Sequence, residues 1–185
     1  MKILVLTGSP HKKGTTALLA EQFIRGAEEA GHSIYRFDAA FQEIHPCNAC
    51  NACQTTDKGC VFKDGMAELY PRLPEADAIV FVAPIYYYGL CAQLKLVIDR
   101  FYALGDALHG DKKCLLLMAC EDDTLESVAG AITSIKGMAG YLGWEMQGII
   151  SALSCADRAA IEKTAYPKQA YELGKNLPIG DGTNW

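Results

Sequence analysis

The sequence predicts a doubly wound α/β fold, in which helices cover both faces of a five-stranded parallel β-sheet. Five apolar segments read as strands, and segments with helical spacing of apolar residues separate them along the chain. The strand segments are apolar at successive positions, a pattern typical of strands buried on both faces. A chain of 185 residues has the length of about one domain.

Each predicted strand is a short run rich in Leu, Ile, Val or Ala. The first ends at Gly8-Ser9-Pro10, and the third ends at Pro84, because these residues favour turns. We expect strands over residues 1–7, 33–37, 76–83, 113–119 and 145–150.

The predicted helices follow from apolar residues that recur at intervals of three or four. In the first helix, Leu19 and Phe23 lie on one face, and the pattern ends at Gly31. We expect helices over residues 15–31, 66–73, 92–104, 125–142 and 168–177. The single domain then spans residues 1–179, with a cysteine-rich insertion at 46–60 and a loose tail at 180–185.

Charge and hydropathy exclude several classes of partner. The net charge is −5 and no stretch concentrates Lys and Arg, so we expect no nucleic-acid partner. The longest uncharged stretch, residues 78–94, contains Pro84 and Gly89 and is shorter than the roughly 20 residues of a membrane-spanning helix. The apolar run at residues 3–6 is too short for a secretion signal. We therefore expect no membrane partner and a cytosolic location.

The loop after the first strand is a candidate phosphate site. It leads into the start of a helix, where unpaired N–H groups and the helix dipole favour an anion. Its spacing matches neither Walker A nor Gly-x-Gly-x-x-Gly, but its hydroxyls suit a phosphate monoester. The alternative is that Thr15 only caps the helix. The candidate residues are Ser9, His11, Lys12, Gly14, Thr15 and Thr16.

The loop after the third strand is a second candidate ligand-binding segment. In the strand order 2-1-3-4-5, the third strand lies beside the first, so the two loops share one crevice. Pro84 and Gly89 would shape a turn against a flat ligand, and a tyrosine offers a stacking face. The alternative is that tyrosines pack in the core or in a subunit contact. The candidate residues are Pro84, Ile85, Tyr86, Tyr87, Tyr88 and Gly89.

Several motifs together resemble the NADPH-dependent FMN reductase group of flavodoxin-like proteins. They are Gly8-Ser9-Pro10 with Gly14-Thr15-Thr16, Ala83-Pro84-Ile85-Tyr86, Gln93-Leu94-Lys95, Ile98-Asp99-Arg100 and Tyr141-Leu142-Gly143-Trp144. The resemblance covers most of the chain. It implies FMN phosphate on the first loop, the isoalloxazine against residues 84–89, and a third wall near Cys120 and Glu121. Many relatives carry Arg where His11 stands and Asn where Thr15 stands.

Four of the eight cysteines fall within a short segment after the second predicted strand, at Cys47, Cys50, Cys53 and Cys60. This compact spacing suits a [4Fe-4S] cluster better than zinc, whose ligands more often form two distant pairs. It is similar to the spacing of iron–sulfur flavoproteins, which implies a cluster that exchanges electrons with FMN. Free thiols, a redox disulfide and zinc remain alternatives. Because the loop leaves the second strand on the same rim, we expect the cluster and the flavin to face one crevice.

The remaining cysteines lie in apolar surroundings, a pattern typical of small core residues. Cys120 is the exception, because it also belongs to the candidate third wall. These cysteines are Cys91, Cys114, Cys120 and Cys155.

The leading functional hypothesis is an FMN-dependent oxidoreductase that works as a homodimer. NAD(P)H or an iron–sulfur carrier such as ferredoxin would donate electrons, and a small molecule would accept them. Since the cofactor carries this chemistry, no catalytic acid or base is nominated. The alternatives are a flavodoxin-like electron carrier without its own substrate and a cofactor-free interaction domain.

Overall fold

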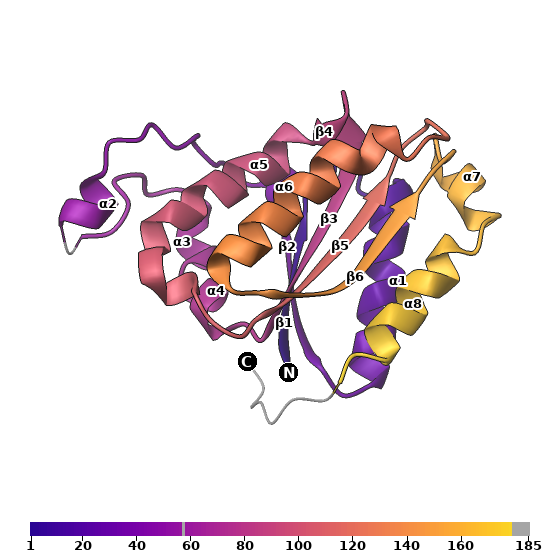
Figure 1. Ribbon diagram of the computed structural model, residues 1–185, viewed down its shortest axis with the longest axis horizontal. Coiled ribbons are helices and arrows are strands. Elements are labelled where there is room, and N and C mark those ends of the chain that lie inside the picture. The colour runs from indigo at the N-terminus through magenta and orange to yellow at the C-terminus, as the bar shows by residue number, and fades with distance from the viewer. Residues whose placement is uncertain (57, 179–185) are drawn as a thin grey trace.

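A parallel sheet runs through the centre of the molecule in the computed structural model, which describes residues 1–56 and 58–178 (Figure 1). Its strands lie in the order β2-β1-β3-β5-β6, so the predicted order of the five main strands is confirmed. These strands are β1 (Lys2–Thr7), β2 (Ser33–Asp38), β3 (Ala78–Tyr86), β5 (Lys113–Ala119) and β6 (Glu145–Ala152).

A sixth strand, β4 (Gly89–Leu90), corrects the prediction of a purely parallel five-stranded sheet. It turns back from the end of β3 and pairs with it antiparallel. A strand of two residues is too short to show periodicity in the sequence. The hairpin follows β3 directly, so it carries the segment with three tyrosines beyond the carboxyl edge of the main sheet.

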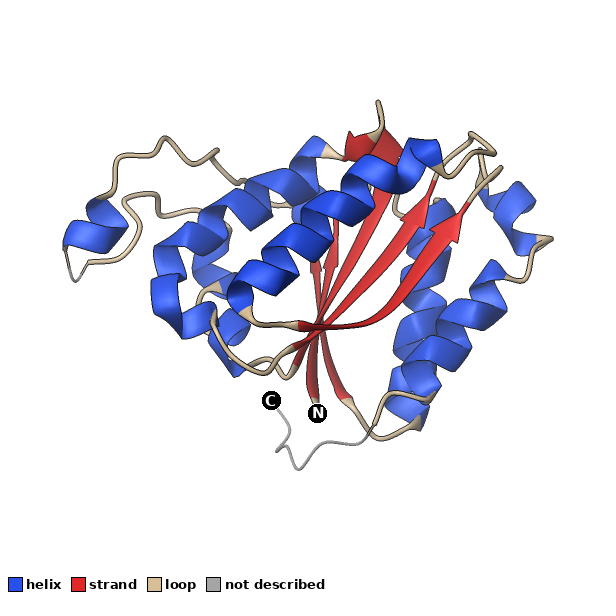
Figure 2. Ribbon diagram, viewed as in Figure 1, coloured by secondary structure: helices blue, strands red, loops and turns tan. Residues whose placement is uncertain are grey.

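Helices cover both faces of the sheet (Figure 2). Successive residues of β1 enter opposite cores, because Leu4 and Leu6 belong to one cluster whereas Ile3 and Val5 belong to the other. The second cluster packs under α1 (Thr15–Glu29), α7 (Arg158–Glu162) and α8 (Tyr166–Lys175). The first packs under α3 (Met66–Leu69), α4 (Arg72–Glu75), α5 (Ala92–Asp99), the 3₁₀ segment η2 (Arg100–Leu108) and α6 (Glu126–Leu142).

Helices α1 and α8 pack backbone against backbone. A Cβ atom at Gly26 would lie 2.1 Å from the carbonyl oxygen of Tyr171, and one at Gly174 would lie 2.2 Å from that of Phe23. Both positions therefore require glycine.

Besides shifts of one or two residues at the helix ends, the observed helices depart from the prediction in two divided helices and one missed helix. The helix expected over 66–73 is divided into α3 and α4, with Pro71 at the junction. The helix expected over 92–104 becomes α5 followed by η2, which kinks at Gly105 (φ 49°). The last helix is α8, and α7, which the sequence reading missed, precedes it.

None of the helices in the described part of the chain has the length and apolarity needed to cross a membrane.

A short 3₁₀ turn, η1 (Ala39–Phe41), follows β2 and leads into the cysteine-rich segment, which carries α2 (Ala52–Thr55). The tail expected at 180–185 lies outside the described residues.

Candidate functional site

A cleft of about 660 Å³ opens at the carboxyl edge of the sheet, a volume typical of small-molecule sites. The loops after β1, β3, β5 and β6 form its walls. It lies where the strand order reverses between β1 and β3, the usual ligand position in open α/β sheets. Its lining residues are Ser9, His11, Lys12, Lys13, Gly14, Thr15, Pro84, Ile85, Tyr86, Ala119, Cys120, Glu121, Cys155, Ala156, Asp157 and Arg158.

The loop after β1 is folded on itself at the start of α1. The Ser9 hydroxyl accepts a hydrogen bond from the His11 amide (3.1 Å), and the His11 carbonyl accepts one from the Gly14 amide (3.1 Å). Gly14 is the N-cap residue, and no side chain caps the helix. The alternative that Thr15 is the cap is therefore wrong. Thr15 occupies the first helical position, and Gly14 and Thr15 line the cleft at a helix start that has no side-chain cap.

This loop is also fixed against the neighbouring elements. The Gly8 amide donates to the Val82 carbonyl of β3 (2.9 Å). A Cβ atom at Gly8 would lie 2.4 Å from the Cys91 sulfur and 2.8 Å from the Leu94 Cβ. The first loop thus packs directly on the start of α5, and Gly8 leaves no room there for a side chain.

The end of β3 lines the cleft, and the turn that follows it forms the hairpin with β4. Pro84, Ile85 and Tyr86 line the cleft, and burial raises the pKa of the Tyr86 hydroxyl, which keeps it a hydrogen-bond donor at neutral pH. Tyr87 and Tyr88 form the turn between β3 and β4, with φ values of 46° and 65°.

Positive φ at both central turn residues is the conformation of a type I′ turn, which Asn and Gly normally occupy. Tyr87 is fully exposed, and α6 packs against the turn because a Cβ atom at Gly130 would lie 2.7 Å from the Tyr88 carbonyl oxygen. Four of the nominated residues do not line the cleft. They are Tyr87, Tyr88, Gly89 and the buried Thr16.

Two buried cysteines form part of the cleft where β5 and β6 end. The Cys155 amide donates to the Cys120 carbonyl (2.8 Å), which joins the two loops. Burial raises the pKa of both thiols, so they stay protonated and apolar at neutral pH. As expected, Cys91, Cys114, Cys120 and Cys155 are all buried. Cys120, the expected exception, and also Cys155 line the cleft as well.

The sequence reading missed the wall that follows β6, which includes Asp157 and Arg158. Asp157 caps α7 by accepting from the Ala160 amide (2.8 Å). Arg158 lines the cleft and forms ion pairs with Glu21 (3.0 Å) and Glu162 (2.9 Å). The sequence could have predicted this wall, because the loop after the last parallel strand leaves the same edge of the sheet as the other loops.

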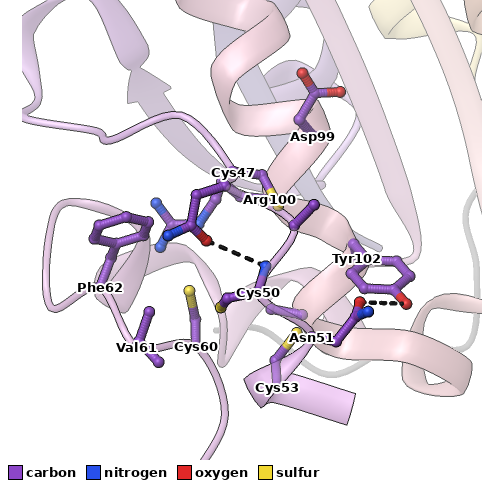
Figure 3. A pocket seen from close by; sticks show the side chains of 13 residues that line it. Cys47, Cys50, Asn51, Cys53, Cys60, Val61, Phe62, Asp99, Arg100 and Tyr102 are labelled. Carbon is purple, nitrogen blue, oxygen red and sulfur yellow. Dashed lines mark hydrogen bonds between the residues drawn. The ribbon is translucent and has the colours of Figure 1, made fainter.

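The four clustered cysteines come together around a second pocket, between the cysteine-rich segment and the start of η2 (Figure 3). Cys47, Cys50, Cys53 and Cys60 line it. In the described part of the chain, no group of three or more His, Cys, Asp or Glu side chains is arranged to hold a metal ion. The geometry thus brings the predicted ligands to one pocket without forming a finished coordination site.

The backbone of the cysteine loop is curled and pinned to η2. Ala49 (φ 55°) and Asn51 (φ 57°) adopt the left-handed conformation that occurs in anion-binding nests around phosphates and iron–sulfur clusters. The Tyr102 hydroxyl donates to the Asn51 side-chain oxygen (3.2 Å). The Gln54 side-chain amide donates to the Tyr102 carbonyl (2.6 Å).

One thiol of this loop is biased toward its ionised form. Burial raises the pKa of Cys60, but hydrogen bonds from the Phe62 amide and the Tyr70 hydroxyl, together with the Arg100 guanidinium, outweigh it and lower the pKa. Thiolate is the form that binds metals. A curled backbone, four thiols and a nearby positive charge therefore fit an anionic iron–sulfur group.

The cleft and the cysteine pocket share no lining residue. The segment that carries α2 protrudes at one end of the molecule, whereas α7 lies at the opposite end (Figure 1). The expectation that both groups face one crevice is wrong within a single chain. The reason is that the segment after β2 turns outward and packs on η2 instead of folding over the cleft.

The sequence model of a family described as NADPH-dependent FMN reductase matches residues 1–141. The chain belongs to this family. The resemblance expected from the motifs of the two loops is thereby confirmed.

Two relatives with curated descriptions are iron–sulfur flavoproteins. An iron–sulfur flavoprotein of Methanocaldococcus jannaschii is 35% identical over 100 residues, which are 54% of this chain and 51% of that protein. An iron–sulfur flavoprotein of Archaeoglobus fulgidus is 39% identical over 102 residues, or 55% of this chain and 51% of that protein. The chain thus spans about half the length of these relatives.

The fold is shared with solved structures of low sequence identity. An NAD(P)H:quinone oxidoreductase from Methanothermobacter marburgensis superposes with a TM-score of 0.69 at 19% identity, over 98% of this chain and 99% of that one. The predicted doubly wound, flavodoxin-like architecture is confirmed.

Proposed function

We propose that this chain binds FMN in the cleft at the carboxyl edge of the sheet and uses it to pass electrons from NAD(P)H to a small acceptor. The observation that carries the proposal is the start of α1, which enters the cleft without a side-chain cap beside the walls formed after β3 and β5. A phosphate monoester suits the first feature and a flat ring suits the second.

The chain's own residues would divide the binding as follows. Amides of the first turn of α1, with the hydroxyls of Ser9 and Thr15, would hold the phosphate, and Lys12 and Arg158 would add positive charge. The segments 84–86 and 119–121 would contact the ring system. FMN, when bound, supplies a hydride acceptor, and the chain supplies its orientation and surrounding dipoles.

Turnover of the reduced nicotinamide tests this function. The protein should bind FMN stoichiometrically and should oxidise NADH or NADPH in the presence of a quinone or free flavin. FMN binding without nicotinamide turnover would instead favour the alternative of an electron carrier that exchanges electrons with protein partners. If the protein does not bind added FMN, both the oxidoreductase and the electron-carrier functions are contradicted.

We also propose that Cys47, Cys50, Cys53 and Cys60 hold one [4Fe-4S] cluster. Support comes from their common pocket, the two left-handed residues between them and the lowered pKa of Cys60. The descriptions of the archaeal relatives as iron–sulfur flavoproteins add to it. Anaerobically reconstituted protein should then contain about four irons per chain.

The Cys50→Ser variant tests the assignment of these ligands. It should lose the cluster while it still binds FMN, because Cys50 lies outside the cleft. The matched control is Cys114→Ser, which removes a thiol buried in the core. Four freely titratable thiols in reconstituted wild-type protein, with no iron, would leave the cluster without support.

A homodimer is the third part of the proposal. Since the cleft and the cysteine pocket lie apart in one chain, a second copy offers a route by which a cluster and a flavin approach each other. Exposed Tyr87, Tyr88 and Tyr141 supply aromatic surface of the kind that is enriched in interfaces. Light scattering should give a mass of twice 20.1 kDa, and a monomer at micromolar concentration would contradict it.

A further inference from the structure

Arg100 is a charged residue that is buried beneath the cysteine loop. Its side chain is 1% exposed, and its partner Asp64 is 2% exposed. The Arg100 Nη1 atom donates to Asp64 Oδ2 (2.8 Å), and Nη2 donates to Asp64 Oδ1 (3.3 Å). Burying two charges costs desolvation energy, and the attraction within a buried ion pair seldom exceeds that cost. Stability alone therefore gives a weak reason for a buried pair at this place.

The contacts of Arg100 connect the two ends of the cysteine loop. Its Nη1 atom also donates to the His45 carbonyl (2.8 Å), two residues before Cys47. Asp64, four residues after Cys60, accepts from the His45 amide (2.9 Å) and so closes the same connection from the other side. One guanidinium and one carboxylate thus hold the beginning and the end of the loop together.

Arg100 also lies against the pocket that the cysteines line. It is one of the lining residues, and its guanidinium stands 5.1 Å from the centre of the Phe62 ring (Figure 3). The Nε atom donates to the Tyr70 hydroxyl (3.2 Å). Hydrogen bonds to Tyr70, His45 and Asp64 thus engage the Nε, Nη1 and Nη2 atoms, and they hold the guanidinium at a fixed place beside the four thiols.

We propose that Arg100 is a positioning residue for the iron–sulfur group: it holds the cysteine loop closed and turns the positive end of its ion pair with Asp64 toward the anionic cluster. Arg100 lines the pocket and Asp64 does not. The inference rests on the cluster assigned under the proposed function. Reduction of a cluster adds one electron and breaks no bond, so the reduced form carries one more negative charge. A fixed cation nearby favours that form and raises the reduction potential.

Two substitutions separate the charge of Arg100 from its shape. Arg100→Lys keeps the positive charge but loses the fork, whereas Arg100→Met keeps the length and loses the charge. Arg72→Met is the matched control, because Arg72 packs on the Tyr35 ring and does not line the cysteine pocket. FMN content, measured on every variant, reports whether the domain has folded.

The measurements are iron per chain after anaerobic reconstitution, the midpoint potential of the cluster and the rate of tryptic cleavage at Lys58 in the iron-free protein. We expect Arg100→Met to lower the potential or to lose iron, and to speed cleavage by about 10-fold or more, since it leaves Asp64 buried and unpaired. Arg100→Lys should restore most of the potential. The Arg72→Met control should match wild type in all three.

Each contrary result has a distinct meaning. If Arg100→Met keeps the iron, the potential and the cleavage rate of wild type, the inference is overturned while the cluster assignment stands. If wild-type protein binds no iron, the cluster assignment fails. In that case the loop-closing role is judged on cleavage alone, and an unchanged rate in Arg100→Met overturns it.

Discussion

Replacing Thr15 by alanine should weaken FMN binding and leave riboflavin binding unchanged. Thr15 lines the cleft at the first helical position of α1, but the cap is Gly14, so its hydroxyl has no capping role to lose. A hydrogen bond to a charged group contributes about 1.5–3 kcal/mol, which corresponds to a loss of about 10- to 150-fold in affinity for FMN. Riboflavin lacks the phosphate and should lose nothing.

Flavin fluorescence quenching or calorimetry measures both affinities on the same preparation. Alanine is a better helix former than threonine, so the melting temperature of the apoprotein should not fall. Thr133→Ala, an exposed position on α6, is the matched control and should leave both affinities unchanged. Equal losses for FMN and riboflavin, or no loss for either, would refute the assignment of the phosphate to this loop.

Three further predictions concern stability. Gly26→Ala should lower the free energy of unfolding by about 1–3 kcal/mol in urea titrations, because its Cβ would meet the Tyr171 backbone, whereas Gly137→Ala, with open space around it, should not destabilise. In iron-free protein, stability should fall between pH 4 and pH 2, since the pKa of Asp64 is lowered to about 2 and its ion pair is lost on protonation; Asp64→Asn should remove that dependence. Burial lowers the pKa of His32, so the folded state favours the neutral ring. The melting temperature should therefore fall as the pH drops below about 6.5. His32→Gln should make the melting temperature less dependent on pH in this range.

Local patterns in the sequence were enough to determine the scaffold and the place of the cleft. Five apolar runs predicted the main strands, and their alternation with helices predicted a doubly wound sheet. The order 2-1-3-4-5 was taken from the flavodoxin-like form of that fold, and the observed order β2-β1-β3-β5-β6 matches it. The loops after β1 and β3 were nominated because parallel strands end at one edge, and Ser9, Pro84 and others from both loops line one cleft. Such inferences succeed because burial on both faces and turn chemistry are encoded within a few residues of each other.

Tertiary packing decided the features that depend on distant partners. The position of Thr15 inside the helix, the hairpin at Tyr87 and the wall containing Arg158 all follow from how loops pack on neighbouring elements. The direction of the cysteine loop is the clearest case. Spacing could group its four thiols, but the loop turns away from the cleft because Asn51 and Gln54 pack on Tyr102 of η2. Arg100 joins the two ends of the loop at His45 and Asp64, residues that only the fold brings together. The partners of a buried charge are residues that the fold brings near it, so patterns of neighbouring residues in the sequence do not predict them.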